Sequence, residues 1–152
     1  MPKYKRTIFV DADSCPVKKE ILFLAQKYHV PVIFVTTYAH VMNEREGEWV
    51  ILDSDDQAVD LYILNHMHSC DIVITQDFGL ASIALNKKGI VISPRGKQFT
   101  EENIDSLLYQ RFISMKVRRS GERVKGMSRF SNEDKQKFLH TLEKKLSIHE
   151  GI

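Results

Sequence analysis

Three aspartates stand where two apolar, β-branched segments of the chain end. Asp11 and Asp13 close the segment at residues 7–13, and Asp77 follows a second such run at 71–75. In an open parallel sheet the carboxyl ends of the strands meet along one edge, so acids from two strands converge there. Converging carboxylates raise one another's pKa or bind a cation, and oxygen ligands suit Mg²⁺ or Mn²⁺ better than Zn²⁺. These residues predict a metal-dependent enzyme.

A fourth acid lies on an apolar helical stripe. A helix is predicted at 55–68, where Asp56 and Asp60 share one face. That face continues through apolar residues, Ile63, Leu64 and Met67. A carboxylate placed among them is costly unless it is paired or bound to metal, which makes Asp60 a candidate site residue. The alternative for Asp60 is that it pairs with an arginine or caps a loop. For Asp56 we favour simple placement in the first helical turn, where an acid is stabilising.

Neighbouring residues allow more than one reading. Asp77 also fits the N-cap of a helix that starts near Gly79. Thr75 and Gln76 are candidates to orient the carboxylates or an attacking water. Cys15, beside a helix amino terminus, is a candidate nucleophile, but no partner histidine accompanies it. We therefore favour packing for the Cys15 side chain.

Length and composition favour a single domain. The chain has 152 residues, 43% of them hydrophobic and 28% charged, and no apolar run approaches the ~20 residues that span a bilayer. The first residues do not resemble a signal peptide, and two cysteines predict no disulfide framework. The six histidines have no metal-site spacing, so zinc is not expected. We expect one domain over 1–152, a cytoplasmic location and no membrane partner.

The net charge of +2 conceals two segments of opposite charge. Residues 44–60 hold seven acids and one base, whereas 87–129 hold eleven bases and four acids. A basic segment of this kind can neutralise phosphates, although a solvated positive face is an equal alternative. Within it, Ser93 and Arg95 follow a predicted strand and offer a hydroxyl and a guanidinium to an anion, or form part of an ordinary turn.

Strands and helices alternate along the first two thirds of the chain. Beyond the strand that ends at Asp11, the patterns predict strands at 32–36, 49–52, 71–75 and 90–92, and helices at 16–29, 55–68, 80–86, 101–116 and 132–146. Ser14 is the expected N-cap of the first helix. Apolar strands of this kind are covered on both faces. We expect a three-layer α/β/α fold with a mostly parallel sheet of about five strands, followed from about residue 100 by a basic helical part.

Three segments resemble a known family. Residues 10–18 (VDADSCPVK), 71–81 (DIVITQDFGLA) and 92–100 (ISPRGKQFT) closely resemble the YaiI/YqxD family of bacterial proteins of unknown function in type, order and spacing. The similarity covers essentially the whole chain, with one departure at Met127, where the family tends to have proline. The family is similar to the PIN-like superfamily, whose nucleases bind Mg²⁺ or Mn²⁺ through a cluster of acids and hydrolyse phosphodiesters.

This resemblance implies roles for particular residues. Asp11, Asp60 and Asp77 match the metal-binding acids of PIN-like nucleases, and Asp13 is an additional acid of the family, so all four are implied catalytic residues. The implied cofactor is Mg²⁺ or Mn²⁺, and the implied partner is nucleic acid, RNA in preference to DNA. A homodimer is a candidate assembly. The residues expected to hold the strand by its phosphates are Arg95, Lys97, Arg118, Arg119 and Arg123.

Two other functions compete with that of a nuclease. Asp11 and Asp13, in a D-x-D pattern at a strand end, also resemble the nucleophile and general acid of haloacid-dehalogenase-like phosphatases, although Asp77 matches the later acidic motif only in part. A nucleic-acid-binding protein without catalysis is the other alternative. Metal-dependent cleavage distinguishes it from the enzymes.

Overall fold

The structure is a computed structural model that describes residues 6–37, 46–53, 57–121 and 129–150. Its elements, in chain order, are β1 (Ile8–Asp11), a 3-10 turn (Ala12–Ser14), α1 (Lys18–Tyr28), β2 (Val32–Thr37), β3 (Glu48–Leu52), α2 (Ala58–His66), β4 (Ile72–Ile74), α3 (Phe78–Asn86), β5 (Ile90–Ile92), β6 (Gln98–Phe99), α4 (Glu101–Arg119) and α5 (Asn132–Glu150). The strands form one sheet in the order β3-β2-β1-β4-β5-β6.

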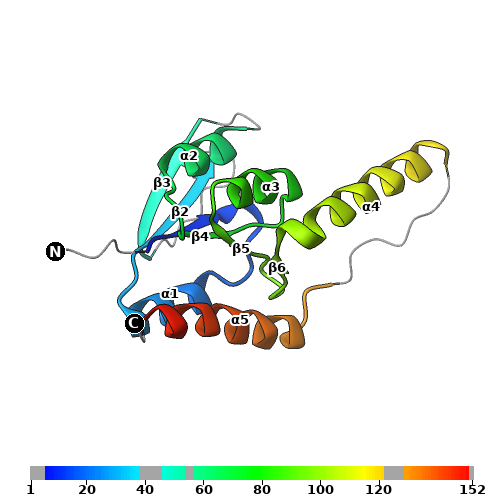
Figure 1. Ribbon diagram of the computed structural model, residues 1–152. Helices are drawn as coiled ribbons and strands as arrows, with labels where there is room; N and C mark the ends of the chain where they lie inside the picture. The colour runs from blue at the N-terminus through cyan, green and yellow to red at the C-terminus, as the bar shows by residue number, and fades with distance from the viewer. Residues whose placement is uncertain (1–5, 38–45, 54–56, 122–128, 151–152) are drawn as a thin grey trace.

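Helices cover both faces of this sheet. In Figure 1, α1 and α5 lie below it, and α2 and α3 lie above it. Successive side chains of a strand point to opposite faces, so Ile8 and Val10 of β1 pack with α1 and α5, while Phe9 packs with α2 and α3. The neighbouring strands β2, β4 and β5 are equally apolar, as strands covered on both faces must be. The predicted three-layer α/β/α fold with a mostly parallel sheet is therefore confirmed.

The sheet has one strand more than the predicted five. Strands β1 to β5 are parallel, and β6 runs antiparallel to β5, with Val91 opposite Phe99 and Ile92 opposite Gln98. Because β6 has only two residues, it is too short to produce a sequence pattern. It follows a turn in which the Gly96 N–H donates to the Ser93 carbonyl at 2.9 Å.

The start predicted for the first helix is wrong. Ser14 belongs to the 3-10 turn that follows β1, and α1 begins only at Lys18. The turn holds Asp13 against the end of β2, where the Thr36 hydroxyl donates to the Asp13 carboxylate at 2.5 Å. The chain then passes through buried Cys15 before it becomes helical. Tertiary contacts therefore override the local capping signal.

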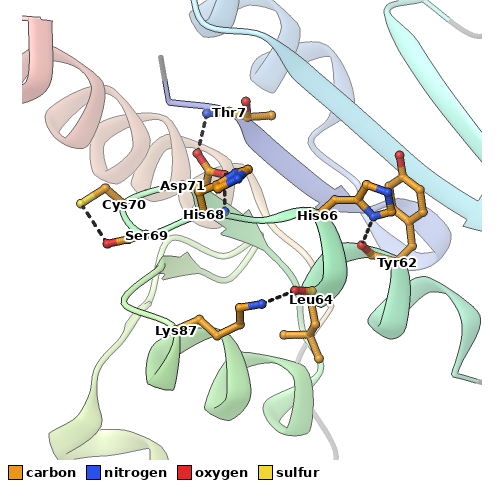
Figure 2. A network of polar contacts seen from close by, with 9 residues as sticks. All are labelled: Thr7, Tyr62, Leu64, His66, His68, Ser69, Cys70, Asp71 and Lys87. Atoms are coloured by element: carbon orange, nitrogen blue, oxygen red, sulfur yellow. Dashed lines mark hydrogen bonds and ion pairs between the residues drawn. The ribbon is translucent and has the colours of Figure 1, made fainter. Parts of the chain in front are cut away.

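A buried acid, Asp71, lies at the edge of the sheet where the parallel strands begin. Its side chain is 1% exposed and accepts hydrogen bonds from the backbone N–H of Thr7 at 2.9 Å and of His68 at 2.8 Å (Figure 2). These bonds join the start of β1 to the loop before β4. The bond to His68 fixes the chain just after α2, which ends at His66, two residues before its predicted end. Asp71 is thus a structural acid, remote from the carboxyl edge that carries Asp11.

The long helix α4 extends away from the rest of the molecule. Its first turn is held by a capping box, in which the Thr100 hydroxyl accepts from the Asn103 N–H and the Asn103 side chain accepts from the Thr100 N–H. From this start α4 leads outward, and its second half lies beyond the sheet and its covering helices (Figure 1). Among the described residues, no helix is both long and apolar enough to cross a membrane.

Candidate functional site

The four predicted acids lie at or beside the carboxyl edge of the sheet. Asp11 is the last residue of β1, Asp13 lies in the 3-10 turn after it, Asp77 directly precedes α3, and Asp60 is in the first turn of α2. All four side chains are half-buried. They come from separate elements that meet because β1 and β4 are adjacent parallel strands. Asp56 and Arg123 lie outside the described residues.

Asp11 is the most constrained of these acids. Burial raises the pKa of its carboxyl, and the charges of Asp13 and Asp77 add to this, whereas a hydrogen bond from Thr75 opposes it. The Thr75 hydroxyl donates to Asp11 Oδ2 at 2.9 Å and accepts from the Asp77 N–H at 2.9 Å. Thr75 is 1% exposed. Of the two candidates to orient a carboxylate, Thr75 thus contacts Asp11 directly.

Asp60 faces the same cluster from α2. Burial raises the pKa of Asp60 to about 6, together with the charges of Asp77 and Asp11 and a hydrogen bond that the protonated carboxyl makes with Asp77. Asp60 therefore lies on the same side of the sheet as Asp11. Among the described residues, the charged groups that shift the pKa of Asp60 are acids, and none is an arginine.

Asp77 has the capping role that its position allowed. Its Oδ1 atom accepts from the backbone N–H groups of Gly79 at 2.8 Å and Leu80 at 3.2 Å, which satisfies the exposed donors at the start of α3. Both bonds end on one of the two carboxylate oxygens. Capping therefore fixes the position of Asp77 next to Asp11 and Asp60, and the two readings of this residue are compatible.

The donor set fits a hard divalent cation in its chemistry. Asp11, Asp60 and Asp77 supply oxygen ligands only. The charge of Asp77 raises the pKa of both Asp11 and Asp60, and the charge of Asp11 also raises that of Asp60. As the side chains stand, no three His, Cys, Asp or Glu residues in the described part of the chain are close enough to share one metal ion. The acids influence one another's pKa, and coordination of one ion by three of them would require at least one carboxylate to move closer to the others.

Two adjoining grooves lie beside the cluster. One of about 330 Å³ is lined by Asp13, Lys18, Gln76, Arg95 and Phe130, and one of about 390 Å³ is lined by Gln76, Phe78, Arg95, Lys97 and Lys137. They share Gln76 and Arg95, and the first groove reaches the edge of the acid cluster at Asp13, whereas Asp11, Asp60 and Asp77 line neither groove. Lys18, Lys137 and Phe130 were not found from the sequence, because they meet the groove only through the packing of α1, of α5 and of the segment before α5; Phe78, the first residue of α3, was not singled out either.

The turn between β5 and β6 shapes this groove. Arg95 Nη1 donates to Asp134 Oδ2 of α5 at 3.0 Å, and its guanidinium lies 5.9 Å from the Phe130 ring centroid. Gly96 has a φ of +87°, and a Cβ atom there would lie 2.6 Å from the Lys137 carbonyl carbon. Only glycine permits this approach. Arg95 thus joins the turn to α5, and exposed Lys97 is held near exposed Lys137.

The remaining predicted basic residues lie elsewhere. Arg118 and Arg119 are exposed in the last turn of α4, roughly 25 Å along the helix from Glu101. Because α4 points away from the body, the structure does not bring them to the groove (Figure 1).

Cys15 is a packing residue, as the sequence favoured. It is 4% exposed within the core cluster, and burial raises the pKa of its thiol to about 11. A thiol with this pKa is protonated at neutral pH and is a poor nucleophile.

The fold and this cluster define an open α/β protein with an acidic site at the carboxyl edge of its sheet. Residues 9–148 match the model of the uncharacterised YaiI/YqxD family, and the chain belongs to this family. A UPF0178 protein of Bacillus cytotoxicus is 48% identical over 145 residues, 95% of each chain, and one of Bacillus velezensis is 47% identical over 97% of this chain and 89% of its own. The resemblance to the YaiI/YqxD family seen in the sequence is confirmed. No solved structure matched the chain.

We expect Asp60→Asn to stabilise the metal-free protein at pH 7 by about 1 kcal/mol, once solvent screening is allowed for. The folded-state pKa of about 6 lies above the ordinary value of 3.8, so ionisation of Asp60 costs stability as the pH rises from 4 to 6. Asparagine removes this cost. Thermal melts in EDTA should therefore show the two proteins closest near pH 4 and separated at pH 7. A variant less stable than the wild type at pH 7 would contradict this.

Proposed function

We propose that this protein is a phosphodiesterase that cleaves single-stranded nucleic acid, RNA in preference to DNA, and requires Mg²⁺ or Mn²⁺. The observation that carries the proposal is the convergence of half-buried acids from β1, α2 and the start of α3 at one edge of the sheet. Burial and the neighbouring acids raise the pKa of Asp11 and Asp60 there. Carboxylates that disfavour one another's charge are stabilised by a divalent cation between them. The resemblance to PIN-like nucleases supports the same assignment.

Each acid has a distinct place in this proposal. Asp11, Asp60 and Asp77 would hold the ion, and Asp13, fixed by the Thr36 hydroxyl, would complete the acidic edge. A divalent ion bound there supplies a Lewis acid that lowers the pKa of a water molecule and stabilises charge on the leaving oxygen. Thr75 contributes by holding the Asp11 carboxylate in one orientation.

The grooves provide a path for a polyanion toward these acids. Lys18, Lys97 and Lys137 line them with positive charge, which suits phosphates. Phe78 and Phe130 add aromatic surface on which unpaired bases stack. Lysine side chains contact phosphates and phenylalanine rings contact base faces, so we expect single strands to bind with little sequence preference.

A salt titration tests this path. Replacing Lys97 and Lys137 together by alanine should weaken oligonucleotide binding and flatten the plot of log affinity against log salt by about 1.4, because each neutralised phosphate of a single strand contributes about 0.7 to the slope. Fluorescence anisotropy with a labelled single-stranded RNA between 50 and 200 mM salt, in EDTA to prevent cleavage, measures both quantities.

The double variant Arg118→Ala/Arg119→Ala is the matched control, since it also removes two positive charges, but from the end of α4. We expect this variant to keep the slope of the wild type. If it flattens the slope instead, and the lysine variant does not, the strand follows α4 rather than the groove. Binding without metal-dependent cleavage would favour the alternative of a nucleic-acid-binding protein.

A further inference from the structure

The outward part of α4 exposes an unusual amount of apolar surface. Tyr109 is 64% exposed, Phe112 52%, Ile113 39% and Met115 43%, although each lies in a regular helix. Only three other large apolar side chains in the described residues are comparably exposed, and they lie singly on α1, α2 and α3. Contiguous exposed apolar surface commonly marks an interaction site, whereas single exposed residues need no explanation.

Three of these residues, Tyr109, Phe112 and Ile113, lie on the side of α4 that faces away from the body, whereas Met115 follows Leu108 and Arg111 on the inner side. Helical spacing places Tyr109, Phe112 and Ile113 together, with Asp105 one turn before them and Lys116 one turn after. The Lys116 ammonium lies 4.9 Å from the Phe112 ring centroid, in agreement with this spacing. We call these five residues the outer stripe.

The inner side of α4 is already occupied. Ile104 is buried, Leu107 and Leu108 are half-buried, and the Arg111 guanidinium lies 6.0 Å from the ring centroid of Phe78 in α3. The outer stripe is therefore a second apolar face, and the packing of α4 on α3 does not use it.

The charges of α4 identify a suitable occupant. The first part of the helix carries Glu102 and Asp105, and its last turns carry Lys116 and Arg119. If a second α4 runs antiparallel with Tyr109 opposite Phe112, the same register puts Asp105 opposite Lys116 and Glu102 opposite Arg119. The match holds in both directions, as an isologous twofold interface requires. Antiparallel pairing also sets opposite ends of the helix dipoles side by side.

We propose that the outer stripe is a homodimer interface, in which two α4 helices pair antiparallel across a twofold axis through the midpoint between Gln110 and Arg111. A second copy of this chain is the occupant because it supplies the complementary charge order on an equal apolar stripe, and the match is self-complementary. One helix pair buries less than a standard interface of about 800 Å² per partner, so the dimer is concentration-dependent.

Charge exchange in the stripe tests this proposal by analytical ultracentrifugation. Wild-type protein should shift from 17.6 kDa toward twice that mass as its concentration rises into the micromolar range. Asp105→Lys and Lys116→Asp should each raise the dissociation constant about tenfold, because each places two like-charge pairs in the interface. An equimolar mixture of the two variants should regain wild-type affinity, since both pairs are then of opposite charge.

Phe23→Ser is the control, because Phe23 is 64% exposed on α1 and outside the stripe. This variant should associate like the wild type, and circular dichroism should show all variants folded. A wild type that stays monomeric, or a dimer that neither charge variant weakens, would overturn the proposal. So would two variants that are each weakened but are not restored by mixing.

Discussion

Asp11→Asn is expected to lower the rate of Mn²⁺-dependent cleavage of a single-stranded RNA by about 100-fold or more. Loss of a residue that only orients a metal ligand costs 10–100-fold, and Asp11 is proposed as a ligand itself. The fold should remain, because the asparagine carbonyl still accepts the Thr75 hydroxyl and one repelling charge is removed. Initial rates for wild type and variant, purified in parallel, measure the effect.

Glu48→Gln is the matched control for this experiment. Glu48 is exposed at the start of β3, on the edge of the sheet opposite Asp11, so its charge should not affect cleavage. EDTA should abolish the activity of the wild type and of this control. Equal rates for Asp11→Asn and wild type would remove Asp11 from the site.

Asp71→Ala is expected to lower the free energy of unfolding by about 2–4 kcal/mol. The carboxylate is 1% exposed and is the acceptor for the N–H groups of Thr7 and His68 (Figure 2), and each buried donor left without an acceptor costs roughly 1–3 kcal/mol. Its charge also favours the protonated form of Arg6, whose pKa burial lowers. Urea denaturation at pH 7 measures the change.

Asp71→Asn separates hydrogen bonding from charge. Asparagine keeps one acceptor oxygen, so its cost should be smaller than that of alanine. A loss below 1 kcal/mol for Asp71→Ala would contradict the structural role that we assign to this acid.

The sequence predicted the positions of the acids in the fold better than it predicted the residues that contact them. The apolar runs before Asp11 and Asp77 are long enough to identify two buried strands, and the parallel arrangement then brings the acids to one edge. Thr75 could be named because it lies two residues before Asp77 in the chain. Thr36, which holds Asp13, could not, because that contact depends on the pairing of β1 with β2.

Other features depend on packing that leaves no local pattern. β6 consists of two residues, and the late start of α1 reflects the contact of Asp13 with β2 rather than helix propensity. Lys137 lines the groove because α5, far along the chain, packs on the turn at Gly96. The outer stripe of α4 resembles a core-facing stripe in sequence, and only the structure shows which side of the helix is covered.

A titration with Mn²⁺ tests the central claim most directly. Electron paramagnetic resonance of free Mn²⁺ should show binding to the wild type and to Glu48→Gln, and at least tenfold weaker binding to Asp60→Asn and Asp77→Asn. Asp77→Asn retains an oxygen that caps α3, so a loss of affinity in this variant reports on the metal site rather than on the helix. Equal affinity of all four proteins for Mn²⁺, or no binding to the wild type, would contradict a metal site built from these acids.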